Sequence, residues 1–247
     1  MGKTPVDRYY RLIDQRRLGS SSAIWKFYVE QLFEGIPLAG KRILDIGAGT
    51  GLLSLYAACN GAERVVALEP EAAGSRQDMR TVFHATAAEL GCTQVEMLPL
   101  TFQEYEPAGQ QFDVVMVHQA INHLDEEACI RLHVDEAARD TFRRLLAKLA
   151  GMCADGAKVI LVDVSRYNFF GQLGLRCPFA KTIEWRKHQP PKVWSRLLSD
   201  AGFRRRRVHW FAFNRLGRLG RILLGNAIAA YFLGTNFCLV ADKAGHD

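Results

Sequence analysis

The stretch that decides the fold is KRILDIGAGTG, residues 41–51. Its first half is an apolar run typical of a short buried strand, and its second half is a glycine-rich turn. The residues that follow, LLSLYAA at 52–58, predict the start of a helix. Glycine has no Cβ and adopts positive φ angles, so the backbone of such a turn can approach a ligand closely. The first N–H groups of the helix point into the same space, so the stretch predicts a loop that binds a nucleotide-like ligand.

The spacing of the glycines narrows the class of ligand. A dinucleotide-binding fingerprint needs a glycine where Leu52 stands, and a phosphate-binding P-loop would end in Gly-Lys-Ser/Thr. The pattern present is Asp45-x-Gly47-x-Gly49-x-Gly51, which resembles the first motif of class I S-adenosylmethionine-dependent methyltransferases. The resemblance implies that this loop, with Ala48 inside it, passes the amino-acid part of that cofactor and that Asp45 lies at the strand end.

An acidic residue ends the next apolar run, residues 64–68. Glu69 stands there, followed by Pro70, roughly 20 residues beyond the glycine loop. A carboxylate in this position can accept hydrogen bonds from both ribose hydroxyls of an adenosine, and charge-assisted bonds are the stronger kind. The resemblance assigns the ribose to Glu69. The family often has an acidic or polar residue near the adenine after the third strand, but the usual aspartate is absent here, and we predict Thr101 and Phe102 in its place. His118 and Gln119 are predicted to line the cofactor pocket.

The remaining pattern predicts an α/β fold with a doubly wound, mainly parallel, seven-stranded sheet. Further strands are predicted at 93–98, 111–118, 157–164, 204–211 and 236–242, with helices between them that include a long helix at about 72–90 and a helical region at about 126–150. Residues 1–40 predict two helices, which the resemblance makes a lid on a methyltransferase domain at 41–247. Two insertions, 165–189 and 214–235, face the substrate in this prediction. The second is a basic and apolar helix suited to a substrate lid, a dimer contact or a membrane surface.

Histidines near the predicted strand ends are candidates for a general base. Methylation of a hydroxyl requires removal of its proton, and histidine suits that role near neutral pH. The first candidate is His123, with Asp163 at the end of the fifth strand to orient it, a pair that resembles some sugar O-methyltransferases. His188, in the first insertion, is the second candidate. The alternative is that His123 caps the following helix and Asp163 merely ends a strand.

Charge is distributed unevenly along the chain. The net charge is +6, but residues 165–247 contain 15 Lys and Arg against 4 Asp and Glu. This bias indicates either an anionic substrate or partner for the last third, or simply a solvated basic face. The leading hypothesis is methylation of a hydroxyl on a small molecule, sugar, glycan or lipid-linked acceptor. The alternatives are RNA methylation, suggested by the four arginines at 204–207, and a non-catalytic binding partner that retains the fold.

The distribution of the cysteines and the lack of an apolar signal segment indicate the cellular compartment of the protein. The six cysteines are dispersed without a C-x-x-C pair, which argues against zinc fingers and disulfides and for a reducing environment. No metal-binding motif is present, and we predict no metal. The first residues lack the apolar core of a signal peptide, so the prediction is a cytoplasmic protein, with a peripheral location at the inner membrane surface as the alternative. The sequence makes no prediction of the oligomeric state.

Overall fold

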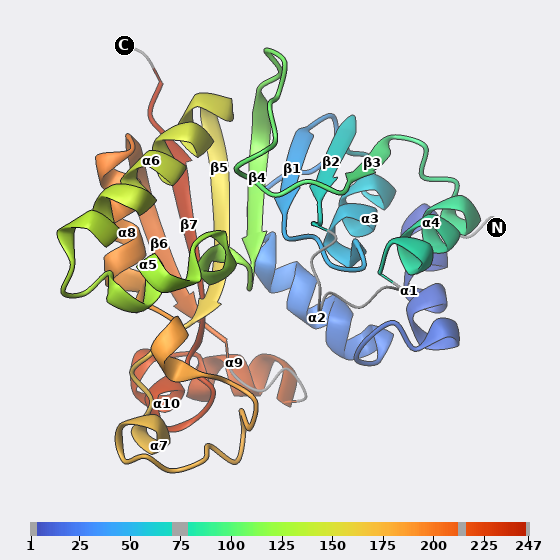
Figure 1. Ribbon diagram of the computed structural model, residues 1–247. Coiled ribbons are helices and arrows are strands. Elements are labelled where there is room, and N and C mark those ends of the chain that lie inside the picture. The colour runs from blue at the N-terminus through green and yellow to red at the C-terminus, as the bar shows by residue number, and fades with distance from the viewer. Residues whose placement is uncertain (1–3, 71–78, 212–215, 246–247) are drawn as a thin grey trace. The chain divides into compact units, whose positions relative to one another are not determined.

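The structure is a computed structural model that describes residues 4–70, 79–211 and 216–245. Its strands form one seven-stranded sheet in the order β3-β2-β1-β4-β5-β7-β6. β1 is parallel to both β2 and β4, and β7 is antiparallel to both β5 and β6 (Figure 1). The predicted seven-stranded, mainly parallel α/β sheet is therefore confirmed. The strands are β1 (Arg42–Ile46), β2 (Arg64–Leu68), β3 (Val95–Leu98), β4 (Phe112–His118), β5 (Cys153–Val164), β6 (Phe203–Trp210) and β7 (Asn236–Lys243).

The chain divides into two compact units, Met1–Val117 and His118–Asp247. The helices of the first unit are α1 (Pro5–Arg16), α2 (Ser22–Leu32), α3 (Leu52–Cys59) and α4 (Met79–Leu90). Thr4 and Asp7 form a capping box that starts α1. The predicted helix from 72 to 90 is described from Met79 onward, and its first residues lie outside the described part.

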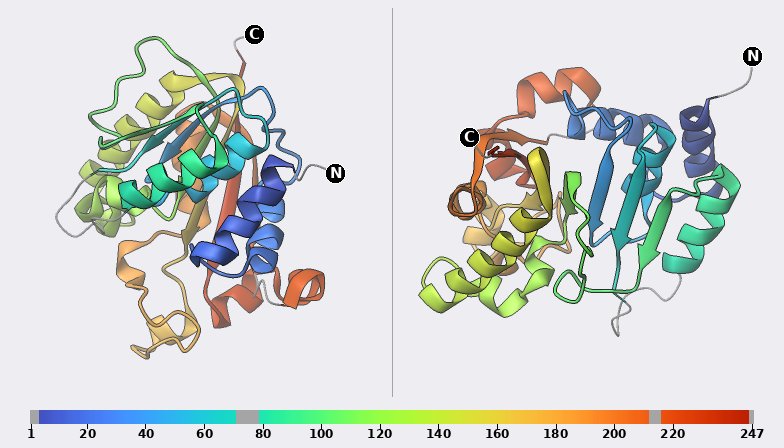
Figure 2. Two further views of the ribbon diagram at one scale, coloured as in Figure 1. Left: turned by 90° about the vertical axis from the view of Figure 1, so that its right-hand side faces the viewer. Right: turned by 90° about the horizontal axis from the view of Figure 1, so that it is seen from above.

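The first N-terminal helix is hydrogen-bonded to the helix that follows the glycine loop, and the second is hydrogen-bonded to the first. α1 packs beside α2 and against α3 and α4 (Figure 2). The hydroxyl of Tyr9 donates a hydrogen bond of 2.9 Å to the carbonyl of Leu52, the first residue of α3. The indole N–H of Trp25 donates in turn to the Tyr9 hydroxyl at 2.7 Å. Tyr9, and Trp25 through its bond to Tyr9, thus support the start of α3. That residues 1–40 form a lid stays a prediction.

The second unit contains shorter helices than the sequence predicts. The helical region expected from 126 to 150 is two helices, because Asp125 and Asp135 each accept a hydrogen bond at a helix start. The helix expected between 214 and 235 is interrupted at Gly225, and Asn226 caps the second piece. The helices are η1 (Ile121–Leu124), α5 (Glu126–Arg131), α6 (Glu136–Met152), α7 (Phe169–Gln172), η2 (Trp185–Lys187), α8 (Pro191–Asp200), α9 (Gly217–Leu224) and α10 (Ala227–Phe232).

The core of the second unit lies between its strands and the α6–α8 layer. Trp194 of α8 is fully buried and meets Phe142 of α6 edge to face, with 5.2 Å between ring centroids. Such aromatic pairs stabilise a core beyond the area that they bury. Over the described residues, none of the helices combines the length and the apolar character needed to cross a membrane.

Candidate functional site

The glycine loop after β1 has a conformation that only glycine adopts easily. Gly47, Gly49 and Gly51 have φ angles of 71°, 57° and 73°. A Cβ on Gly51 would lie 2.4 Å from Cδ2 of Phe83, so this position has no room for a side chain. The N–H groups of Gly47 and Ala48 both donate to the carbonyl of Leu68, at 2.9 and 3.0 Å. The loop is therefore held against the end of β2.

Asp45 lies beneath this loop at the end of β1 and is almost fully buried. Its Oδ2 accepts a 2.6 Å hydrogen bond from the hydroxyl of Ser54, while Oδ1 has no partner among the described residues. Burial raises the pKa of Asp45 to about 6, the negative charge of Glu69 adds to this, and the bond from Ser54 opposes it. A buried carboxylate with one oxygen still unpaired suits a cationic group of a ligand. Sequence reasoning missed Ser54, although it stands on the first turn of the predicted helix.

Glu69 joins the two sequence motifs directly. It follows β2, and its Oε2 accepts a 2.7 Å hydrogen bond from the backbone N–H of Gly49. The carboxylate therefore lies against the glycine loop, and it can accept further hydrogen bonds from hydroxyl groups. Asp45, Glu69 and the open backbone of the loop fit a ligand that carries an amine and a ribose diol.

Thr101 and Phe102, predicted to lie near the adenine, and Pro70, predicted to bind the cofactor, lie in different surroundings. The backbone N–H and the hydroxyl of Thr101 both donate to Oε2 of Glu104, at 2.9 and 2.8 Å. Phe102 is 2% exposed and belongs to the core of the first unit. Pro70 is half-buried and directly precedes residues 71–78, which lie outside the described part. Contact of these three residues with a ligand stays a prediction.

In the second unit, Asp163 and His188 form a buried pair. Asp163, at the end of β5, has no measurable exposure, and its Oδ1 lies 2.8 Å from Nδ1 of His188. Burial raises the pKa of Asp163, and the hydrogen bond with His188 opposes that rise. Oδ2 of Asp163 has no partner among the residues described. The side chain of His188 is 16% exposed and that of Asp163 only 1%, so what exposure the pair has lies mainly at the imidazole.

Two buried residues that sequence reasoning missed hold His188 in place. The amide of Gln189 donates a 2.6 Å hydrogen bond to the carbonyl of Cys129, and the thiol of Cys129 donates to the carbonyl of Lys187 at 3.3 Å. The residues on both sides of His188 are therefore fixed to α5. The Gln-Pro-Pro sequence at 189–191 marks a rigid segment, but nothing in it indicates this partner.

The other predicted residues of this unit are His118, Gln119 and His123, and the hydrogen bond between Asp163 and His188 does not include them. The side chain of His123, in η1, is 66% exposed, and its Nδ1 lies 3.7 Å from Oε2 of Glu126. Burial lowers the pKa of His118 to about 4, so its imidazole stays neutral. Gln119 has a φ of 52°, and its N–H donates to the carbonyl of Val162 at 2.7 Å. Asp163 is thus bonded to His188, whereas the sequence predicted His123 as its partner.

No group of three or more His, Cys, Asp or Glu among the described residues is arranged to hold a metal ion. The polar groups described above are instead single carboxylates and one carboxylate–histidine pair. Their chemistry is that of hydrogen bonding and proton transfer.

The chain is similar to known proteins in sequence and in fold. A family model described as a methyltransferase domain matches residues 23–208. The chain is 28% identical over 184 residues to the ubiquinone biosynthesis O-methyltransferase of Ruegeria sp. (strain TM1040), a match that covers 72% of this chain and 66% of the relative. It is 35% identical over 88 residues to the enzyme of the same description from Rhizobium etli (strain CIAT 652), covering 36% of this chain and 33% of that one. These matches span one third to two thirds of the relatives' length.

Solved structures share the fold at low sequence identity. An S-adenosylmethionine-dependent methyltransferase from Mesorhizobium loti superposes with a TM-score of 0.60 at 14% identity, covering 90% of this chain and 98% of that one. A second, from Aquifex aeolicus, has a TM-score of 0.60 at 16% identity and covers 93% and 96%. The family model matches most of the chain, including the glycine loop, and its description as a methyltransferase domain agrees with the shared fold. The chain therefore belongs to the methyltransferase domain family, the class I methyltransferases that use S-adenosylmethionine as methyl donor.

Proposed function

We propose that this methyltransferase methylates a hydroxyl group of a small-molecule, sugar or lipid-linked acceptor, with His188 as the general base. The observation that carries the proposal is the buried Asp163–His188 pair, with 2.8 Å between Oδ1 and Nδ1. The relatives whose names describe O-methyltransferases support the choice of an oxygen acceptor. When bound, S-adenosylmethionine supplies an electrophilic methyl group.

The first unit would hold the cofactor through its two carboxylates. Asp45, with an unpaired buried Oδ1, would bind the cationic amino group, and Glu69 would accept hydrogen bonds from the ribose hydroxyls. The positive φ angles of the glycine loop leave its backbone open to the cofactor's amino-acid part.

The Asp163–His188 pair would move the proton. Because Asp163 accepts the Nδ1–H bond, Nε2 of His188 is left as the proton acceptor. The buried carboxylate also stabilises the imidazolium that forms when Nε2 takes the hydroxyl proton. The deprotonated oxygen would be the nucleophile for the electrophilic methyl group that bound S-adenosylmethionine supplies, and the proton would stay on His188. His123 is the alternative base, and its large exposure makes it the weaker candidate, because an exposed imidazole is neither oriented nor shielded from water.

The test is transfer of a labelled methyl group to fractionated cell extract. Purified protein and S-adenosylmethionine labelled in the methyl group are incubated with lipid, glycan, small-molecule and nucleic-acid pools. We expect an alkali-stable methyl ether in one of the first three pools. Label in nucleic acid alone, or on nitrogen alone, would contradict the proposal.

The affinity for S-adenosylmethionine is expected to fall as the pH falls through about 6. The raised pKa of Asp45 means that the carboxyl takes up a proton near that pH and loses the charge that would hold the amino group. Calorimetric titrations from about pH 8 to about pH 5 measure this dependence. In Ser54→Ala the midpoint moves to higher pH, since the lost hydrogen bond is the one that lowers the pKa of Asp45. An affinity that is constant over this range would argue against the role of Asp45.

The two insertions form one lobe that we propose contacts a membrane surface. The lobe contains α7, α9 and α10 and lies where β5 ends (Figure 1). The side chain of the buried Asn168 holds it together by donating to the carbonyls of Tyr231 and Leu233, at 3.1 and 2.7 Å. Large apolar side chains remain exposed on its helices, namely Leu219, Ile222, Leu223, Ile228 and Phe232. Arg218 and Arg221 also belong to α9. A surface that combines basic and exposed apolar side chains suits contact with anionic lipid headgroups.

Vesicle sedimentation tests this contact. Wild-type protein is expected to sediment with vesicles of phosphatidylglycerol and phosphatidylcholine, and much less with phosphatidylcholine alone. Ile222→Asp combined with Leu223→Asp should abolish sedimentation. Val134→Asp is the matched control, because Val134 is equally exposed but lies between α5 and α6, outside the lobe. Equal sedimentation of the double variant and the control would contradict the proposal.

The RNA alternative rests on Arg204, Arg205, Arg206 and Arg207, all exposed on β6. β6 is the last strand in the sheet order, and charged side chains on an edge strand prevent pairing with another sheet. This structural explanation accounts for the arginines without nucleic acid. RNA methylation therefore stays a prediction with less support than the hydroxyl acceptor.

A further inference from the structure

A groove of about 680 Å³ lies within the second unit between α6 and α8. We call it the α6–α8 groove. The turn between α5 and α6, together with Tyr167 and Pro190, completes its lining. A volume of this size falls within the range of small-molecule sites. None of its lining residues has a role in the proposed methyl transfer.

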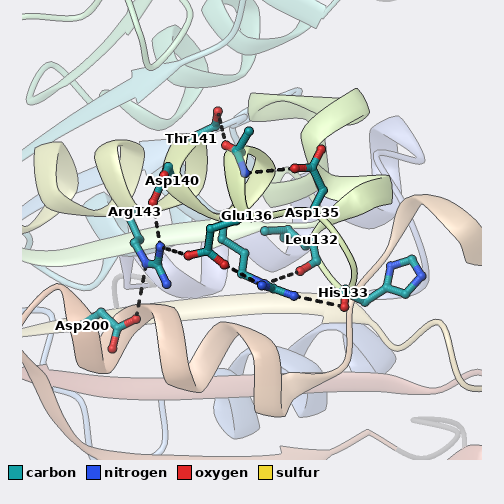
Figure 3. Close-up of polar contacts among 10 residues, drawn as sticks. Leu132, His133, Asp135, Glu136, Asp140, Thr141, Arg143 and Asp200 are labelled. Atoms are coloured by element: carbon teal, nitrogen blue, oxygen red, sulfur yellow. Dashed lines mark hydrogen bonds and ion pairs between the residues drawn. The ribbon is translucent and has the colours of Figure 1, made fainter.

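The α6 side of the groove is a fixed network of ion pairs. Glu136 accepts hydrogen bonds from Arg139 at 2.6 Å and from Arg143 at 2.5 Å. Arg143 also bonds Asp140 at 2.6 Å, and its Nε lies 3.8 Å from Asp200 of α8 (Figure 3). Carboxylates therefore compensate the charges of both arginines. Arg139 additionally donates to the carbonyls of the α5–α6 turn, which rigidifies this wall.

The α8 side of the groove carries two cations without partners. Lys192 and Arg196 stand one helical turn apart and both line the groove, and the side chain of neither has a hydrogen bond or ion pair within the described residues. Four cations and two carboxylates line the groove in total, so its net charge is positive. Arg166, bonded to the groove residue His133 at 2.8 Å, adds a further cation beside it. The excess positive charge is thus concentrated where the side chains are unpaired.

The floor of the groove is apolar. Leu132 and Leu197 are buried there, and Val193 and Pro190 are half-buried. The ring of Tyr167 is about half exposed at the edge. Apolar walls with a few convergent polar groups are the usual composition of a small-molecule site.

We propose that the α6–α8 groove binds a small organic anion, one with a phosphate or carboxylate group attached to an apolar ring or chain. Lys192 and Arg196 bind the anionic group, for which the planar guanidinium offers two parallel hydrogen bonds. Tyr167 and the leucine floor contact the apolar part. The site is separate in its residues from the cofactor loop and from the Asp163–His188 pair, so it does not depend on the proposed reaction.

Calorimetry on the full chain tests this proposal with four probes. Phenyl phosphate and benzoate carry both an anion and a ring, inorganic phosphate carries only the anion, and benzyl alcohol carries only the ring. We expect at least one of the first two to bind with a Kd below about 1 mM. Inorganic phosphate and benzyl alcohol should each bind at least tenfold more weakly. The ring signals of His133 in an NMR titration should shift with the same saturation curve, because His133 lines the groove.

Paired charge substitutions locate the binding. The double variant Lys192→Gln with Arg196→Gln is expected to raise the Kd of the probe that binds at least tenfold. Arg176→Gln with Lys181→Gln removes the same charge from exposed positions outside the groove and should leave the affinity unchanged. If the first double variant fails to fold, Arg196→Gln alone serves. The proposal is overturned if neither aromatic anion binds, if inorganic phosphate binds as tightly as phenyl phosphate, or if both double variants lose affinity equally.

Discussion

Replacing His188 with alanine is expected to lower the turnover number by about 10²- to 10⁴-fold, the usual contribution of a general base. The affinity for S-adenosylmethionine should not change, because the carboxylates assigned to the cofactor, Asp45 and Glu69, belong to β1 and to the residue after β2. The measurements are the initial rate of methyl transfer to the labelled pool and calorimetry of cofactor binding. A loss in turnover without a loss in cofactor affinity separates proton transfer from general damage to the fold.

Two further variants decide how the base is assigned. Asp163→Asn keeps the shape of the pair but removes the charge that orients His188, so it should lower the turnover number and change the pH–rate profile. His123→Ala tests the alternative, since the side chain of His123 is mostly exposed and lies near Glu126. If His123→Ala lost more activity than His188→Ala, the assignment of the base to His188 would be wrong.

Replacing Gly51 with alanine is expected to lower the free energy of unfolding by about 2–5 kcal/mol. The left-handed backbone costs a residue with a Cβ roughly 1–2 kcal/mol, and overpacking of a filled core costs roughly 1–3 kcal/mol more. Both causes act here, because φ is +73° and the new Cβ would lie 2.4 Å and 2.9 Å from two carbons of the Phe83 ring. Denaturant unfolding measures the loss, and the variant should also lose cofactor affinity, because the loop is displaced.

Gly40 provides the matched control. It has a φ of +68°, but nothing lies within 4 Å of the position that its Cβ would take. Gly40→Ala should therefore show only the backbone cost. Phe83→Leu, added to Gly51→Ala, should recover part of the lost stability by relieving the contact. Equal losses for the two glycine variants would show that the Phe83 contact does not matter.

The features that could be predicted from the sequence are those that local sequence patterns determine. The strand at 41–46, the glycine turn and Glu69 occur within about 30 residues, and parallel strand order follows from the alternation of strands and helices. The same pattern predicted the seven strands. The breaks at Asp135 and Asn226 were missed because capping side chains act through bonds to their own backbone neighbours, and each lies inside an otherwise helical pattern.

The partner of Asp163 depends on tertiary structure rather than on spacing. His123 follows β4 and therefore looked close to the end of β5, while His188 lies 25 residues beyond Asp163 in an insertion without periodicity. What brings His188 to Asp163 is the buried bond from Gln189 to Cys129, which is 60 residues away. A single sequence contains no signal for such a contact. The α6–α8 groove was missed for the same reason. Its unpaired cations, Lys192 and Arg196, belong to a helix whose sequence pattern is that of an ordinary exposed helix.

The bond from Tyr9 to Leu52 predicts that cofactor binding and the docking of α1 are coupled. α1 donates a hydrogen bond to the first carbonyl of the helix that ends the glycine loop, so undocking of α1 changes the free energy of the loop. Thermodynamic linkage is reciprocal: whatever α1 adds to cofactor affinity, bound cofactor returns as resistance of α1 to undocking. The same bond makes the phenol of Tyr9 a reporter of that coupling. Tyr9→Phe keeps the ring but removes this bond and the one that Trp25 donates to the same hydroxyl, and so measures what the two bonds together contribute to the coupling.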